Sequence, residues 1–355
     1  MYNAFFGFTL NPFNMSPDPA FLFRSTQHEE ALANLIYGVQ SRKGFIVLTG
    51  EVGTGKTTML ECLRDFLSSQ QIAFASLFNS RLSVEQFFEM LSYDLDLRCN
   101  RHSKTEVLLS LNNFLMERTA GGRTTVLIVD EAHNLEWDVL EEIRLLGNLE
   151  CGEEKLLQIL LLGQSELDDM LNRPELWQLK QRISVRLSIG SLAPSEVEHY
   201  IQHRWTVAGG QSHPFTAEAI EHIRRWSKGI PRVINAICDG SLTHAFADET
   251  RSVSAGHVDS AAEDLQLIEK RVVRRAAAAV PTAATQPATL AQVANGAAAT
   301  VPVLAAPPPP AVPVNGSSAA GHRPMKVLES YAPRPRRRSV FSRWAEKLGL
   351  SSPGN

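Results

Sequence analysis

The sequence lacks the features that would place it outside a reducing compartment. Its N-terminus, "MYNAFFGFTLNPF", has neither a basic region nor a long apolar run, so a cleaved signal peptide is not expected. No apolar run approaches the roughly 20 residues of a membrane-spanning helix. The few cysteines are scattered without a C-x-x-C pair, which argues against a disulfide framework and a zinc site. They are Cys62, Cys99, Cys151 and Cys238. These absences favour a cytoplasmic protein.

Acidic residues are scarce only in the C-terminal part of the chain. The formal net charge is -3, but from Arg271 onward 11 basic residues face two acidic ones. The first 270 residues carry 24 basic and 36 acidic residues. An acidic body argues against nucleic-acid binding through bulk charge, whereas the basic tail could contact an anionic surface.

Short apolar runs alternate with helical patterns over residues 1–190. The runs are rich in β-branched residues, as are strands that are buried on both faces of a parallel sheet. They lie at 44–50, 72–78, 124–132 and 155–164. Repeated strand–helix units predict a doubly wound α/β domain with a parallel sheet.

The strand pattern stops near Pro194. Residues 191–270 carry amphipathic helical patterns at 193–209, 215–229 and 230–248, which predict a small all-helical lid domain. Residues 271–325 are rich in Pro and Ala and predict a disordered linker. Residues 326–355 form a basic tail, in which a short helix would gather apolar side chains on one face; a solvated, disordered tail is the alternative. Those side chains are Phe341, Trp344, Ala345 and Leu348.

The stretch "GEVGTGKT" at 50–57 matches the phosphate-loop pattern G-x-x-x-x-G-K-[ST]. Its glycines allow backbone N–H groups to converge on phosphate oxygens at the N-terminus of the following helix. Lys56 would reach the β- and γ-phosphates, and the Thr57 hydroxyl would complete a Mg²⁺ shell. The residues expected to contact the nucleotide are Gly50, Glu51, Val52, Gly53, Thr54, Gly55, Lys56, Thr57 and Thr58.

A second acidic element follows about 75 residues later in "TVLIVDEAHNL". An apolar strand delivers Asp130 and Glu131 to the edge of the sheet where ligands bind in open α/β folds. Asp130 would hold Mg²⁺ through water, and Glu131 would polarise the attacking water. A pure nucleotide switch does not need the second acid, so Glu131 favours hydrolysis.

Four further polar residues complete the predicted site. Gln164 ends the apolar run "ILLLGQ" and would lie between Glu131 and the γ-phosphate. In "LKQRISVRL", Arg182 or Arg186 would reach the γ-phosphate of a neighbouring subunit, unless it pairs locally. Arg232 begins a helix of the lid domain and would approach the γ-phosphate from that side. Each of these residues also has a structural explanation as a surface group.

These elements, in this order, resemble those of AAA+ ATPases, and most closely the general secretion pathway protein A (GspA/ExeA) type, with its MSHA-pilus and exosortase-associated relatives. The matching segments include "NPFNMSPDPAFLF", "LTGEVGTGKTT", "LIVDEAHNL", "LLLGQSEL" and "KGIPRVINAICDGSL", and together they cover about residues 2–265. The resemblance implies that Gln164 is sensor 1, that Arg232 is sensor 2 and that Arg182 is the arginine finger. It also implies that Pro12, Phe13 and Asp18 line the adenine side.

The sequence departs from that family in two places. "GQSEL" stands where "GQPEL" is usual, and Pro/Ala-rich chain stands where the family continues into a membrane helix and a peptidoglycan-binding domain. The leading hypothesis is an oligomeric ATPase, using ATP and Mg²⁺, that supports an envelope export system for secretion, pili or exopolysaccharide. It would be cytoplasmic or peripheral at the inner membrane, held there by the tail. The alternative is a DNA-associated ATPase of the transposition-regulator (TniB) or origin-recognition type.

Overall fold

The computed structural model describes residues 2–78, 81–152 and 154–268, which belong to a compact unit spanning Met1–Arg271. The predicted linker at 271–325 and the predicted basic tail at 326–355 lie outside the described residues. The boundary expected at residues 190 and 191 falls inside the compact unit, and it stays a prediction. Within the described residues, no helix is both long enough and apolar enough to cross a membrane.

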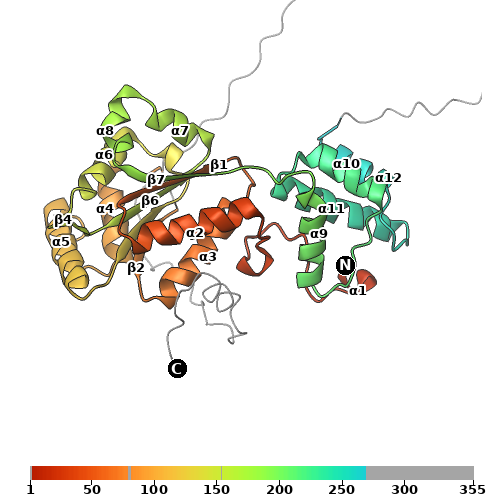
Figure 1. The fold of residues 1–355 in the computed structure, drawn as a ribbon, viewed down its shortest axis with the longest axis horizontal. Coiled ribbons are helices and arrows are strands. Elements are labelled where there is room, and N and C mark those ends of the chain that lie inside the picture. Colours follow the sequence, from red (N-terminus) through yellow and green to blue (C-terminus); the bar gives the residue numbers. More distant parts are fainter. Residues whose placement is uncertain (1, 79–80, 153, 269–355) are drawn as a thin grey trace, which may run out of the picture. The chain divides into compact units, whose positions relative to one another are not determined.

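A five-stranded sheet forms the centre of the α/β half (Figure 1). The strand order is β2-β3-β6-β1-β7, and every neighbouring pair is parallel. The strands are β1 (Phe45–Gly50), β2 (Ala73–Leu77), β3 (Thr125–Val129), β6 (Gln158–Gly163) and β7 (Ile183–Ile189). The short strands β4 (Glu150–Cys151) and β5 (Glu154–Lys155) pair separately and antiparallel. The predicted parallel α/β sheet is confirmed.

The central strands and the edge strand β7 carry different sequence patterns. All residues of β1, β3 and β6 are buried, because helices cover both faces of the sheet there. β7 alternates apolar and polar residues and buries only its last residue, Ile189. It was not among the predicted strands, because those were sought as continuous apolar runs. Alternation is the signal of a half-exposed edge strand.

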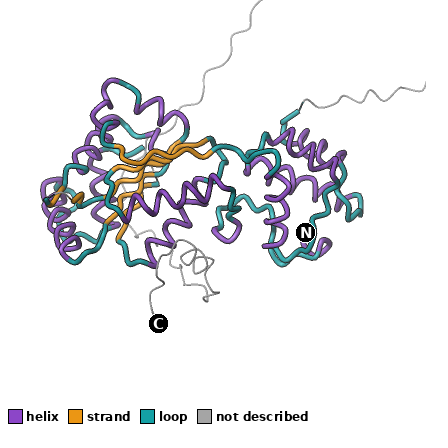
Figure 2. The backbone as a smooth tube through the Cα atoms, viewed as in Figure 1, coloured by secondary structure: helices purple, strands orange, loops and turns teal. Residues whose placement is uncertain are grey.

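Helices lie on both faces of the sheet (Figure 2). On one face are α2 (Thr26–Gln40) and α3 (Lys56–Ser69). Side chains of the remaining helices form one hydrophobic cluster with alternate residues of the strands, such as Val47, Leu127 and Leu161. These helices are α4 (Val84–Asp94), α5 (Lys104–Ala120), α6 (Trp137–Leu146), α7 (Ser165–Leu171) and α8 (Trp177–Lys180), with the 3-10 turns η2 (Ala132–Asn134) and η3 (Pro174–Leu176) between them.

The lid domain has its own hydrophobic cluster around Ile201, Ile234 and Leu242. Its helices are α9 (Glu196–Val207), α10 (Ala217–Ser227), α11 (Pro231–Ala247) and α12 (Ala255–Asp264). The first three correspond to the predicted helices. α12 was not predicted, although Ser254 and His257 form a capping box at its start.

The N-terminal segment contains α1 (Asn3–Phe6) and the 3-10 turn η1 (Pro19–Phe21). Its aromatic residues pack into the lid domain, and η1 also contacts α3. Four of its aromatic residues belong to the lid cluster, and the Phe8 ring meets Trp205 of α9 at 4.2 Å. They are Tyr2, Phe8, Phe13 and Phe21. The sequence grouped this segment with residues 1–190, but its aromatic side chains are buried only where the lid helices receive them.

Candidate nucleotide site

The sheet order brings the three predicted motifs together. β6 lies between β1 and β3, and Thr49 pairs with Gly163 while Val129 pairs with Leu161. The segments after these strands therefore emerge side by side at the carboxyl edge of the sheet. This is the edge at which ligands bind in open parallel sheets.

The phosphate loop requires glycine at several positions. Gly53 and Gly55 have φ of +83° and +104°, which disfavour any side chain. A Cβ on Gly50 would lie 2.5 Å from the Ile189 carbonyl oxygen, and one on Gly53 would lie 2.6 Å from Arg232 Cβ. The loop is thus a tight backbone turn at the N-terminus of α3, the kind of position at which backbone N–H groups bind phosphate.

Lys56 lies inside this turn. Its ammonium donates to the carbonyl oxygens of Gly50 at 2.7 Å and Glu51 at 2.9 Å, and only 6% of the residue is exposed. Burial lowers the pKa of Lys56, whereas the carboxylates of Glu131, Asp130 and Glu166 act in the opposite direction. The charge is thus held at the loop by groups that a phosphate anion would join or replace.

Asp130 and Glu131 follow β3 directly. Asp130 is 9% exposed, and burial raises the pKa of its carboxyl group. One carboxylate oxygen accepts the Glu131 backbone N–H at 2.9 Å. Glu131 itself has φ of +52°, a conformation that costs about 1–3 kcal/mol for a residue with a side chain. This turn directs the Glu131 side chain toward the end of β6.

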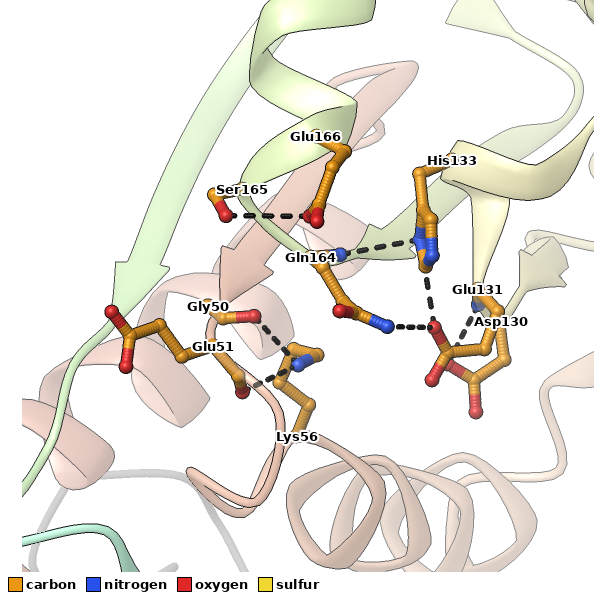
Figure 3. A network of polar contacts seen from close by, with 9 residues as sticks. All are labelled: Gly50, Glu51, Lys56, Asp130, Glu131, His133, Gln164, Ser165 and Glu166. Atoms are coloured by element: carbon orange, nitrogen blue, oxygen red, sulfur yellow. Dashed lines mark hydrogen bonds and ion pairs between the residues drawn. The ribbon is translucent and has the colours of Figure 1, made fainter. Parts of the chain in front are cut away.

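Gln164 contacts Glu131. Figure 3 shows the Gln164 side chain between Lys56 and the acidic pair Asp130 and Glu131. The Gln164 Nε2 donates to Glu131 Oε2 at 3.3 Å, and the Gln164 backbone N–H donates to His133 Nδ1 at 3.3 Å. His133 Nδ1 also lies 3.5 Å from Glu131 Oε2. In this geometry Nδ1 accepts the Gln164 backbone N–H, so the Nδ1 lone pair faces Gln164.

A cavity of about 340 Å³ opens beside the loop. Residues 52–58 of the loop and Glu131 line it, and Arg232 enters from α11, where its backbone N–H donates to the Gly53 carbonyl at 3.1 Å. The remaining lining comes from the N-terminal segment, from His28 of α2 and from the lid domain. These residues are Asn14, Met15, Ser16, Pro17, Asp18, Phe21, Leu22, Phe23, His28, Leu192, Tyr200, Arg204, Pro231 and Asn235.

The structure places the residues predicted for the adenine side at two depths. Asp18 lines the cavity. Pro12 and Phe13 are buried behind it: Phe13 is 1% exposed and packs near Phe215, and the Pro12 carbonyl accepts a hydrogen bond from Arg204. Their predicted contact with the base stays a prediction, and the structure gives them a supporting position.

The two candidate arginine fingers differ in their surroundings. Arg186 pairs with Asp168, through its Nε at 3.1 Å and its Nη2 at 2.5 Å, which is the local pairing considered from sequence. Arg182 precedes β7 at the edge of the sheet opposite the loop, because Ile183 pairs with Phe45. It donates to the Arg144 carbonyl at 3.2 Å and to the Asn148 side chain. Arg182 does not line the cavity of its own chain.

Several cavity residues were not predicted from the sequence, and His28 and Arg204 are two of them. His28 Nε2 contacts the Thr54 carbonyl at 3.0 Å and its Nδ1 contacts Ser25 Oγ at 2.6 Å, so α2 is tied to the phosphate loop. Arg204 lies within an amphipathic helix whose sequence pattern predicts packing against the lid core and no role in a site. A histidine or arginine on a helix carries no motif, and only the fold brings these two to the cavity.

The donor set fits a nucleotide with Mg²⁺. Within the described ranges, no cluster of three or more His, Cys, Asp or Glu side chains could hold a metal alone. Mg²⁺ generally uses one or two protein oxygens with water and substrate phosphates. Thr57, which lines the cavity, and the buried Asp130 match that need.

Comparisons with known proteins agree with this arrangement. Residues 39–171 match the family model described as an AAA domain. The chain is 41% identical over 267 residues to general secretion pathway protein A of Aeromonas hydrophila, a match that covers 75% of this chain and 48% of that protein. The chain therefore spans about half the length of this relative.

Solved structures share the fold at low identity. Cdc6p from Pyrobaculum aerophilum has a TM-score of 0.58 at 18% identity, covering 70% of each chain. A Drosophila ORC structure bound to DNA has a TM-score of 0.52 at 21% identity, covering 72% of this chain and 64% of that one. The solved structures show the shared fold alone. The AAA-domain match and the identity to general secretion pathway protein A, together with the phosphate loop and the parallel sheet, show that the chain is an AAA protein related to general secretion pathway protein A.

Proposed function

We propose that this chain binds ATP with Mg²⁺ in the cavity beside the phosphate loop and hydrolyses it to ADP and phosphate. The observation that carries the proposal is the convergence of Lys56, Glu131 and Gln164 at neighbouring strand ends. Lys56 would hold the β- and γ-phosphates, and Glu131 would accept a proton from the attacking water. Gln164 would orient Glu131, and Arg232 would bring the lid domain to the γ-phosphate.

Thr57 and Asp130 would hold the metal. Mg²⁺, when bound, supplies positive charge that offsets the charge developing on the phosphates. Burial raises the pKa of Asp130, and a cation bound beside it would favour the charged carboxylate.

The substitution Glu131→Gln tests the chemistry. It keeps the shape and the contact with Gln164 but removes the base, so ATP turnover should fall by about 10²–10⁴-fold while ATP affinity stays within threefold. Phosphate release and isothermal titration calorimetry measure the two quantities. Glu136→Gln is the matched control, because Glu136 is an exposed glutamate at the start of α6. Unchanged turnover in Glu131→Gln would remove Glu131 from the mechanism.

We also propose that hydrolysis serves a cell-envelope export system, with the chain acting as a homo-oligomer that is cytoplasmic or peripheral at the inner membrane. The support is the 41% identity to general secretion pathway protein A. The basic tail would supply the membrane contact, each nearby cation contributing about 1 kcal/mol at an anionic surface.

Co-sedimentation tests this second proposal. The full chain should sediment with vesicles that contain anionic phosphatidylglycerol, and a chain ending at Arg271 should not. Duplex DNA titrated at graded salt is the competing arm, because phosphate contacts give a steep salt dependence. Tight DNA binding without vesicle binding would favour the DNA-associated alternative.

A further inference from the structure

Arg204 is a buried cation on α9, and its hydrogen bonds to the part of the chain that the structure describes go to neutral oxygens. The residue is 7% exposed. Its Nε donates to the Pro12 carbonyl at 2.5 Å, its Nη2 to the Asn14 carbonyl at 3.2 Å, and its Nη1 to the Tyr200 hydroxyl at 3.3 Å. Burying a guanidinium without a carboxylate is costly, so this arrangement indicates a specific task rather than stability alone.

The task is suggested by the backbone that Arg204 holds. Asn14 is the first of the residues at 14–18 that line the cavity, and Pro12 lies two residues before it. These lining residues are irregular in structure, and Asn14 to Pro17 are exposed. The Arg204 guanidinium also lies 4.7 Å from the centre of the Phe21 ring, another lining residue. We call the lining residues from Asn14 to Phe21 the N-terminal wall. The rigid, planar guanidinium of Arg204 contacts this wall at both ends and therefore fixes its path.

The same side chain connects the wall to the phosphate loop. The Tyr200 hydroxyl donates to Asn235 Oδ1 of α11 at 2.9 Å. Asn235 lies one turn after Arg232, whose backbone N–H bonds to Gly53. The N-terminal wall, two helices of the lid domain and the loop are thus joined through Arg204.

The two parts of the lining suit different parts of a nucleotide. The loop, with its N–H groups and Lys56, suits phosphates. The other walls contain Phe21, Leu22, Leu192 and Tyr200, which suit a planar base. We propose that Arg204 is the positioning residue for the base side of the site, a proposal that rests on the ATP-binding function proposed above. By bonding the carbonyls of Pro12 and Asn14, Arg204 fastens the N-terminal wall to α9 of the lid domain. The base is therefore held only when the N-terminal wall and the lid domain are both in place.

Binding of ATP and of inorganic tripolyphosphate to the full chain tests this assignment, because tripolyphosphate carries the phosphates without a base. Arg204→Gln should weaken ATP binding at least tenfold and change tripolyphosphate binding less than twofold. Arg204→Lys keeps the charge but not the fork, so it should lose most of the same ATP affinity. Arg225→Gln, at an exposed arginine of the lid domain, is the matched control and should leave both affinities unchanged.

Tyr200→Phe provides a second variant that removes a single oxygen. It should weaken ATP binding by about two- to fivefold and leave tripolyphosphate binding unchanged, and it decides the matter if circular dichroism shows that Arg204→Gln does not fold. Equal losses for both ligands, or no loss for either, would overturn the base-side role. If the wild-type chain binds tripolyphosphate as tightly as ATP, there is no base side and the inference fails. If it binds neither ligand, the proposed ATP-binding function fails first.

Discussion

At the residue scale, the phosphate loop depends on space that only glycine leaves. Gly50 ends β1 against the edge strand, where a Cβ would meet the Ile189 carbonyl oxygen at 2.5 Å. The Ile189 carbonyl belongs to the backbone, so the backbone itself would have to move. The requirement arises from the β1–β7 pairing and is separate from ligand binding.

Gly50→Ala should therefore lower the free energy of unfolding by about 1–3 kcal/mol, the usual cost of overpacking. Gly190→Ala is the matched control, because its Cβ would meet only the Gln27 side chain at an ordinary 3.7 Å. Urea denaturation without nucleotide measures both variants. Equal stability of the two would show that the strand edge yields easily.

His28 gives a pH dependence at the same scale. Burial lowers the pKa of His28, against smaller raising effects from the Thr54 carbonyl and Glu196. The folded state therefore favours neutral His28, which contributes stability that is present above the unfolded pKa near 6.5 and is lost as pH falls below it.

The free energy of unfolding should fall between pH 7.5 and 5.5, and His28→Gln should reduce that fall. Denaturation curves of both proteins at the two pH values measure the difference. Burial also lowers the pKa of His203 and His213, so part of the fall should remain in the variant. An identical fall in both proteins would exclude His28 as a contributor.

At the element scale, Asp168 of α7 links two strands. Its Oδ2 accepts from the Thr49 hydroxyl of β1 at 2.9 Å, and its Oδ1 pairs with Arg186 of β7. The helix that follows Gln164 is thereby anchored to the strand that leads into the phosphate loop. The paired side chains of Arg186 and Asp168 remain 38% and 32% exposed, so water weakens this ion pair.

A double-mutant cycle of Asp168→Asn and Arg186→Gln should give a coupling free energy below about 1 kcal/mol. The measurement is urea denaturation of the wild type, both single variants and the double variant. A coupling above about 2 kcal/mol would mean that the pair behaves as a buried one and that β7 is held mainly by charge.

At the scale of the whole molecule, Arg182 bears on whether the site is complete in one chain. It precedes β7 at the level of Phe45, whereas the loop follows Gly50 at the level of Ile189. Strands rise by about 3.3 Å per residue, so the two ends lie roughly 20 Å apart. An arginine side chain does not span that distance, so an arginine finger at Arg182 would have to act on a neighbouring copy.

Mixing Arg182→Ala chains with Lys56→Ala chains tests this arrangement. Each variant alone should lose at least tenfold in ATP turnover, and the mixture should recover part of it, because intact Lys56 sites would receive intact Arg182 from their neighbours. Steady-state phosphate release measures the recovery. Arg186→Ala in place of Arg182→Ala is the control, since Arg186 is paired within its own chain. Absence of recovery would count against a finger in trans.

The sequence by itself determined the parallel sheet, the phosphate loop and the order of Lys56, Glu131, Gln164 and Arg232. A buried strand needs a continuous apolar run, and the phosphate loop needs glycines at fixed spacing. Both patterns lie within a few consecutive residues and are therefore visible in the sequence. The edge strand β7, helix α12 and the cavity roles of His28 and Arg204 were decided only by the tertiary structure. The contacts that bring such residues to the cavity join parts of the chain as distant as Pro12 and Arg204. A hydrogen bond between such distant parts leaves no periodicity or spacing in the sequence, because it depends on how the N-terminal segment and the lid helices bury their aromatic side chains together.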